Sequence, residues 1–415
     1  MGDTAVVDVS KFVALIGEEL WLKRVGNLRA GLERSAFEAK VVADYFWLEL
    51  VLDDACTPER RDLLEKAGGL NDLLAAQSFA TTTVQVHQHL TKRGKNALTG
   101  RLRAALQSDG GMAPLYIEME VTRQLWDAGF EVTFTDLEGL ANFDLLFRNA
   151  RADGEVECKA ISVDAGRKIH RKHFYRFIDA VSEQIGDQIN SGADDVLVIE
   201  LDDRLPSEAG KHDELRDAFV PFLRDQSRAN HRGSFFSLTR ESFSKRFSSE
   251  QLTSQSVFHD SCRNLYGSTC HISGGLKPDL SSAAIVVMRS QREDDHSKPI
   301  LDALKEAADQ LSKTRPGFIA VQLNDIVPTD LIGEGIRGRS EILSQHVLRD
   351  PKREHVVATL FTAYGGLVSN ATGAGCPAFA FVNPHKINLQ EYAPFLSHMP
   401  DEQFAELLGA VGGPR

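Results

Sequence analysis

Residues 141–160 constrain the fold of this chain more than any other stretch, because they have the pattern of a β-hairpin that carries charge. An apolar run is followed by a turn cluster that ends in Asp153-Gly154, and a second strand-like run comes after it. Side chains alternate between the two faces of a strand. Glu157 and Lys159 are therefore expected to project together from one face of the second strand.

The first strand of the hairpin contributes a second acid, Asp144. Alternation places Asp144 opposite the face shared by three apolar neighbours, Phe143, Leu145 and Phe147. Ionisable groups on an apolar hairpin are costly to desolvate unless they pair with each other or bind a cation, so this combination indicates a site. The alternative is a surface ion pair between Glu157 and Lys159 on a solvated sheet face. Glu-x-Lys is a common tripeptide and occurs again at Glu38-Ala39-Lys40, but there in a helical stretch.

The hairpin resembles the core of the PD-(D/E)XK nuclease superfamily, with Asp144 as the first acid and Glu157-Cys158-Lys159 as the E-x-K element. The chain departs from the family pattern at Phe143, where the family motif has proline. The resemblance covers about residues 114–201. It implies an α/β fold with a restriction-endonuclease-like core, ordered helix, strand, strand, strand, helix, strand.

The surrounding pattern supplies elements in that order. Residues 115–128 have the periodicity of a helix that Gly129 ends, and residues 130–135 alternate as a strand. After the hairpin, residues 169–189 predict an amphipathic helix and residues 196–201 a buried parallel strand. We therefore expect a helical N-terminal region at 1–110, a nuclease-like core at 111–205 and a further α/β region at 206–415.

In the C-terminal region, strands are expected at residues 283–288, 316–323, 356–362 and 377–382, and helices at 300–311 and 400–408. Residues 333–339 are expected to form a flexible basic loop. The sequence leaves open whether these strands extend the nuclease sheet or form a separate layer.

The resemblance also implies a mechanism, metal-dependent phosphodiester hydrolysis. Asp144 and Glu157 would hold Mg²⁺ or Mn²⁺ together with the backbone carbonyl of Cys158, because hard cations bind oxygen ligands. Lys159 would position the attacking water or help to deprotonate it. The family often adds a glutamate from the first helix. Glu118 is the preferred candidate because it borders the apolar face, whereas Glu120 is expected to be solvated.

A basic segment follows the second strand of the hairpin. Between Lys159 and Arg176 there are six basic residues and one acid, Asp164. Bases at a helix N-terminus oppose the helix dipole, so a phosphate partner explains them better than a solvated surface. The expected nucleic-acid contacts, with a further amide at Gln184, are Lys168, Arg171, Lys172 and Arg176.

Composition limits the class of protein. The net charge of −12 argues against a protein that coats nucleic acid with its whole surface. No apolar run approaches the length of a membrane span, no signal peptide opens the chain, and five scattered cysteines favour a reducing cytoplasm. The helical N-terminal region carries no motif of chemistry, and could recognise substrate, mediate oligomerisation or bind another protein.

The leading hypothesis is a cytoplasmic Mg²⁺-dependent endonuclease that acts on DNA, with genome defence or repair as the expected setting; RNA remains open as a substrate. The first rival is a catalytically inactive protein of the same fold that binds nucleic acid or a partner protein. A more distant rival is an α/β enzyme for small molecules.

Overall fold

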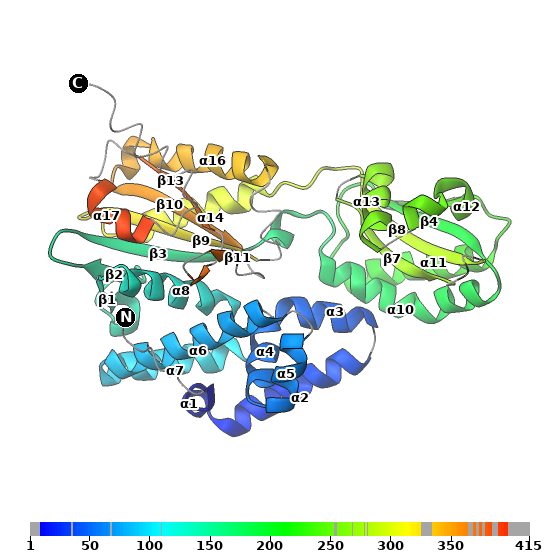
Figure 1. The fold of residues 1–415 in the computed structure, drawn as a ribbon. Coiled ribbons are helices and arrows are strands. Elements are labelled where there is room, and N and C mark those ends of the chain that lie inside the picture. The colour runs from blue at the N-terminus through cyan, green and yellow to red at the C-terminus, as the bar shows by residue number, and fades with distance from the viewer. Residues whose placement is uncertain are drawn as a thin grey trace. The chain divides into compact units, whose positions relative to one another are not determined.

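The chain forms two compact units in the computed structural model (Figure 1). Unit 1 comprises Met1–Gly31, Val42–Val163 and Ser297–Arg415, and unit 2 comprises Leu32–Val41 and Asp164–His296. The structure describes residues 9–34, 36–66, 69–108, 110–252, 255–267, 269–277, 279, 281–324, 334–363, 368–370, 373–375, 378–383 and 389–396.

The N-terminal region is helical, as expected. Its helices are α1 (Val9–Ile16), α2 (Glu18–Arg34), α3 (Ala36–Tyr45), α4 (Trp47–Ala55), α5 (Pro58–Lys66), α6 (Leu70–His89) and α7 (Lys92–Ala105). Local sequence explains several of the boundaries. Pro58 opens α5, because proline has no N–H to lose at a helix start, and the Thr91 side chain accepts a hydrogen bond from the Gly94 N–H at the start of α7.

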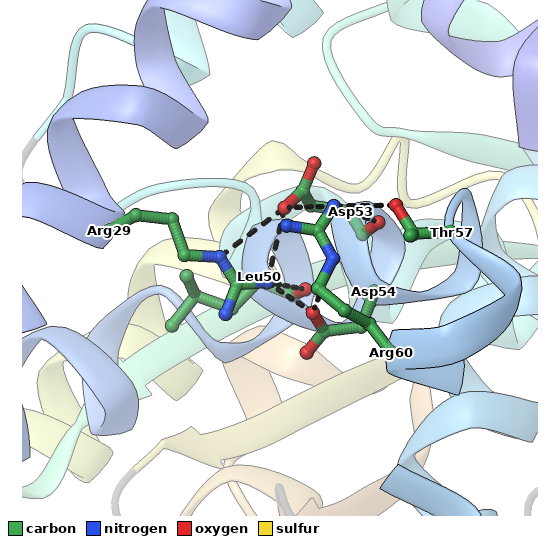
Figure 2. A network of polar contacts seen from close by, with 6 residues as sticks. All are labelled: Arg29, Leu50, Asp53, Asp54, Thr57 and Arg60. Carbon is green, nitrogen blue, oxygen red and sulfur yellow. Dashed lines mark hydrogen bonds and ion pairs between the residues drawn. The ribbon is translucent and has the colours of Figure 1, made fainter. Parts of the chain in front are cut away.

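Ion pairs tie three of these helices together (Figure 2). Asp53 of α4 lies 3.1 Å from Nη2 of Arg29 in α2 and 3.0 Å from Nη2 of Arg60 in α5. Asp54 pairs with the same two arginines. Two acids at the end of α4 are thus shared between two cations, and a network of this kind orients helices better than an isolated surface pair.

Unit 1 is built on a six-stranded sheet in the order β1-β2-β3-β9-β10-β13. The strands are β1 (Glu131–Phe134), β2 (Leu145–Arg148), β3 (Asp153–Ser162), β9 (Gly317–Asn324), β10 (Val356–Ala363) and β13 (Ala378–Val382). β9 pairs in parallel with both β3 and β10, and the remaining pairs are antiparallel. The helices are α8 (Ala113–Asp127), α9 (Thr135–Glu138), α14 (Ser297–Gln310), α16 (Glu334–Leu348) and α17 (Leu389–Leu396). A separate ribbon joins β11 (Val368–Asn370) and β12 (Gly373–Gly375).

Helices cover both faces of this sheet (Figure 1). One core contains residues of α8 with Val156 of β3 and Phe318 of β9. The opposite core contains residues of α14 and α16 with Ile161 and Ile319 of the same two strands. Both strands thus contribute apolar residues to the cores on both faces of the sheet, as strands in the middle of a three-layer α/β unit do.

Unit 2 is a second α/β unit. Its elements are α10 (Arg171–Asn190), β4 (Asp194–Leu201), α11 (Ala209–Arg224), β5 (Asn230–Arg232), β6 (Phe236–Ser242), α12 (Phe243–Arg246), α13 (Gln255–Tyr266), β7 (His271–Leu276) and β8 (Ala283–Ser290). Among the described residues, short 3₁₀ turns lie at Val163–Gly166 and Ser249–Leu252, and at Pro351–Arg353 in unit 1. The sheet has the order β5-β6-β4-β8-β7, in which β4 and β8 are parallel and the other pairs antiparallel. α10 and α11 share one core, and α12 and α13 share the other.

The helix and strand expected to complete the hairpin's sheet do not do so. The segments predicted at 169–189 and 196–201 are α10 and β4, and β4 pairs with β6 and β8 in the sheet of unit 2. The local pattern misled because β4 is apolar on both faces, which suits the middle of either sheet. The next helix and strand of unit 1 after β3 are α14 and β9. The units divide at residues 31/32, 41/42, 163/164 and 296/297.

The C-terminal strands separate accordingly. β9, β10 and β13 extend the hairpin's sheet, whereas β8 belongs to unit 2. The flexible loop expected at 333–339 is wrong, because α16 begins at Glu334. The helix predicted at 400–408 lies outside the described residues.

The chain enters and leaves unit 2 at adjacent points. The Asp295 N–H donates to the Gly166 carbonyl at 2.9 Å, and a Cβ on Gly166 would lie 2.5 Å from the Asp295 carbonyl oxygen. Glycine permits this close approach of two backbones. The Asp164–His296 segment of unit 2 is thus an insertion whose two ends lie side by side. No described helix combines the length and the hydropathy of a membrane span.

Candidate functional site

The hairpin predicted from the sequence is present, with its turn shifted by a few residues. Leu145 pairs with Val156, and Arg148 pairs with Asp153. The turn is residues 149–152, where Oδ1 of Asn149 accepts hydrogen bonds from the N–H groups of Arg151 and Ala152. Asp153-Gly154 therefore begins β3 rather than closing the turn.

Gly154 has a packing role in that strand. A Cβ there would lie 2.5 Å from the ring of the buried Phe147 and 3.1 Å from the ring of Phe318. The glycine thus allows two aromatic rings to lie against the strand, which explains why a residue typical of turns occurs inside it.

Asp144 precedes β2 and lies opposite Glu157 when the antiparallel register is continued by one pair. The Cys158 N–H donates to Oδ2 of Asp144 at 2.7 Å, and the Asp144 N–H donates to Oε2 of Glu157 at 3.2 Å. Both acids are buried, with exposed fractions of 9% and 3%. The backbone of the hairpin thus holds the two carboxylates beside each other.

The expected alternation fails at one residue of the first strand. Phe143 belongs to the core under α14, whereas Leu145 and Phe147 belong to the core under α8. The regular strand starts only at Leu145, so the period of two does not extend back to Phe143. Asp144 consequently interacts electrostatically with groups from both layers, including Arg101 of α7 and Lys159 of β3.

Lys159 is held by three partners. Its Nζ lies 3.1 Å from Oε1 of Glu157, 3.0 Å from Oε1 of Glu306 and 2.5 Å from Oε1 of Gln310. Burial lowers the pKa of Lys159, but the Glu306 hydrogen bond and the Glu157 charge raise it overall. The Glu157–Lys159 ion pair is present, as the alternative interpretation expected. Glu157 is buried, however, so the pair does not lie on a solvated sheet face.

Glu306 and Gln310 belong to α14 and were not predicted. The sequence offers no local signal for them, because the chain passes through the whole of unit 2 before it returns to this sheet.

The two glutamates of α8 are both buried, with exposed fractions of 5% for Glu118 and 6% for Glu120. The expectation that Glu120 is solvated is therefore wrong. Arg123 pairs with Glu120 at 2.6 Å, and the Gln124 side chain donates to it at 3.0 Å. α8 packs against the sheet on one side and α6 on another, so its polar face is covered as well.

Glu118 lies near two other acids, Asp144 and Asp136, and all three interact with an arginine that the sequence did not indicate. The Arg101 guanidinium of α7 pairs with Glu118 and, through Nη1, with Oδ2 of Asp136 at 2.8 Å. Oε2 of Glu118 is buried and accepts no hydrogen bond from the described residues. Asp136, in α9 directly after β1, is a further acid missed by sequence reasoning; its place at the end of a strand was the available signal.

Burial and mutual repulsion raise the pKa of these carboxyl groups. Burial, followed by the Asp144 and Asp136 charges, raises the pKa of Glu118 to about 8 against the opposing effect of Arg101. Burial and the Asp144 charge raise the pKa of Glu157 to about 8. Burial, then Asp136, raises the pKa of Asp144 to about 6, although the Cys158 N–H lowers it. These acids would be stabilised by additional positive charge.

The chemistry of this donor set fits a hard divalent cation, although the described side chains are not placed to coordinate one. Four acids, Glu118, Asp136, Asp144 and Glu157, face two bases, Arg101 and Lys159. Fully ionised, the cluster carries two more negative charges than positive, if the exposed Glu306 is left aside. Within the described ranges, however, no three His, Cys, Asp or Glu side chains are placed so that they could hold a metal ion.

The residues predicted to bind nucleic acid lie in unit 2 and differ in how available they are. Lys168 pairs with Asp203 at 3.0 Å, and Nε of Arg171 lies 3.5 Å from Asp164 with the side chain 14% exposed. Lys172 and Gln184 are half-buried, and Arg176 is exposed. The four bases therefore do not form one open face, because local acids neutralise the first two.

Comparisons with family models, curated proteins and solved structures give no match for this chain. The proposal for its function therefore starts from the hairpin and the acids around it.

Proposed function

We propose that this chain is a Mg²⁺- or Mn²⁺-dependent nuclease that hydrolyses phosphodiester bonds in DNA. The observation that carries the proposal is the hairpin arrangement itself. Hydrogen bonds from backbone N–H groups of the hairpin hold the Asp144 and Glu157 carboxylates beside each other. Nζ of Lys159 lies 3.1 Å from Glu157. Perturbed carboxyl groups beside a lysine are typical of functional sites.

The order of elements in unit 1 supports the resemblance to the PD-(D/E)XK superfamily. With unit 2 set aside, α8, β1, β2, β3, α14 and β9 follow the order helix, strand, strand, strand, helix, strand; the short α9 lies between β1 and β2. The proposed core is thus interrupted after the E-x-K strand by an inserted α/β unit. The cytoplasm remains the proposed compartment.

In this proposal Asp144 and Glu157 would hold the metal, and the Cys158 carbonyl and Glu118 would be further oxygen ligands. A bound Mg²⁺ supplies a water of lowered pKa and neutralises phosphate charge. Lys159 donates hydrogen bonds to the attacking water or to a phosphate oxygen and stabilises the negative charge that develops there. Glu306 and Gln310 restrict the position of the lysine Nζ.

Unit 2 is proposed to contact the DNA backbone through the basic side of α10, where Arg176 is exposed. Arginines and lysines beside a helix N-terminus favour phosphate binding. The N-terminal helices are proposed to mediate self-association or to bind a partner protein.

The rival is a catalytically inactive protein of the same fold that binds nucleic acid or a partner protein. The observation in its favour is the pairing of Glu118 and Asp136 with Arg101, which places a fixed cation within the acid cluster.

Incubation of the purified chain with plasmid, single-stranded DNA and RNA separates the two. We expect cleavage of DNA with Mg²⁺ or Mn²⁺, none with EDTA, and loss of activity in Asp144→Asn and Lys159→Ala with the circular dichroism spectrum unchanged. Cleavage at the wild-type rate in both variants would place the active site elsewhere. Metal-independent binding without cleavage would favour the rival.

A further inference from the structure

Arg101 is the residue of the cluster that the proposed chemistry does not use. It comes from α7, a helix outside the order of elements that resembles a nuclease core. Its guanidinium contacts Glu118 with one nitrogen and Asp136 with another, and its charge also lowers the pKa of Asp144. One side chain thus interacts with three of the four acids.

We propose that Arg101 is an internal cation that competes with the divalent metal, so that the metal enters by displacing the guanidinium from Glu118. This inference rests on the proposed function, because it concerns the regulation of the same site. Arg101 then lowers the apparent metal affinity, because only molecules in which the guanidinium has left Glu118 can bind the metal there.

The charges explain why the two cations exclude each other at Glu118. A buried carboxylate is strongly destabilised when it loses its counter-ion, so Arg101 leaves Glu118 at low cost only if another cation replaces it. The two Arg101 contacts are not equivalent. Glu118 has an exposed fraction of 5%, whereas the Asp136 side chain is 26% exposed and can keep the guanidinium near the surface.

The geometry also allows the movement. The Arg101 side chain is 35% exposed, so it can turn away from Glu118 without a shift of α7. Oε2 of Glu118, which accepts no hydrogen bond from the described residues, is then a buried oxygen ready for a hard cation. The same exchange accounts for acids that suit a metal chemically but whose described side chains, paired with Arg101, are not placed to coordinate one.

Mn²⁺ binding to the full chain, followed by electron paramagnetic resonance of the free ion, tests the inference without any reading of activity. Arg101→Gln is expected to tighten Mn²⁺ binding by about fivefold or more, the lower end of typical coupling between sites. Arg101→Lys keeps the charge but cannot bridge two carboxylates, so an intermediate affinity is expected. Circular dichroism confirms that each variant is folded.

Arg123→Gln is the matched control, because Arg123 also pairs with a buried glutamate of α8, Glu120. It should leave Mn²⁺ affinity within about twofold of the wild type. Equal or weaker binding in both Arg101 variants, at a site that Asp144→Asn abolishes, overturns the inference and leaves the proposed function standing. If neither the wild type nor Arg101→Gln binds Mn²⁺, the metal site and the proposed function both fail.

Discussion

Buried acids with raised pKa values occur in two different surroundings in the described part of this chain. One group surrounds Asp144, and a separate case is Glu49 in α4, which is fully buried within the N-terminal helices. Each has a pKa raised chiefly by burial. The difference lies in the neighbours. Asp144 has other acids beside it, whereas Glu49 has Arg24 at 3.8 Å and the Met112 N–H at 3.2 Å. Clustering of acids therefore indicates a site more specifically than a raised pKa does.

Glu118 and Glu120 provide a matched test of the site, because they are equally buried on the same helix. Glu118→Gln is expected to lower metal-dependent cleavage at least tenfold, since Glu118 lies within the acid cluster. Glu120→Gln should affect cleavage little and act on stability instead, because Glu120 pairs with Arg123. Initial rates and thermal unfolding of both variants check this. The opposite ranking would place Glu120 in the site.

Glu49 should make stability depend on pH. Its pKa is raised from 4.5 to about 7, so the folded state retains the proton more tightly than the unfolded state does. Stability from this residue is fully present below about pH 4.5 and falls as the pH rises to about 7, by about 3 kcal/mol. Glu49→Gln should remove this fall and stabilise the chain at pH 8. Urea unfolding from pH 4 to 8 measures this fall in stability, and a substitution at an exposed glutamate, Glu65→Gln, is the control. Parallel pH profiles of stability in the wild type and Glu49→Gln would refute the prediction.

Among the elements, α10 shows how local neighbours decide what a basic helix can do. Arg171 lies at the first turn of α10, where Asp164 pairs with its side chain and also accepts its N–H at 3.3 Å. Asp164 thus satisfies a helix N-terminus in the usual way, with a negative charge. Arg176, further along the helix, is exposed and better placed for a phosphate partner.

This difference can be measured on the intact chain. Changing Lys172 and Arg176 together to glutamine is expected to weaken DNA binding. It should also reduce the slope of log affinity against log salt concentration by roughly one for each phosphate that the protein no longer neutralises. Arg171→Gln should change that slope less and thermal stability more, because it breaks the ion pair with Asp164. Fluorescence anisotropy across a salt series provides both slopes. An unchanged slope in the double variant would mean that α10 does not bind DNA.

At the scale of the whole molecule, unit 2 interrupts unit 1 between β3 and α14. The crossings at 163/164 and 296/297 lie close together, because the Asp295 N–H donates to the Gly166 carbonyl nearby. Insertions are tolerated where the two ends lie close together, because the host unit closes without strain. Each unit also has hydrophobic cores of its own.

Replacement of residues 167–294 by a short Gly/Ser linker should therefore leave unit 1 folded. We expect a cooperative thermal transition, and Mn²⁺ binding that Asp144→Asn abolishes, because the acids of the cluster all belong to unit 1. Binding to DNA should weaken in the same protein. A product that is soluble but lacks cooperative unfolding would show that unit 1 depends on unit 2 for its stability.

Sequence alone determined the elements whose pattern is local. The hairpin, α8 and the helical N-terminal region follow from apolar periodicity, and the shared side of Glu157 and Lys159 follows from strand alternation. Gly129, which has a left-handed φ of 82° just after α8, ends that helix as expected. These features depend on neighbours a few residues apart, so they can be predicted without knowledge of the fold.

Tertiary structure decided which elements share a sheet and which charges meet. β4 and β9 are both apolar on both faces, so their sequences do not distinguish the strand that pairs with β3 from the one that pairs with β8. Arg101 reaches Glu118 and Asp136 from α7, and Glu306 reaches Lys159 from α14, beyond the whole inserted segment. α6 packs against α8, whose Glu120 is buried. Burial and electrostatic contact depend on distance in space, and a long insertion removes the link between that distance and separation along the chain.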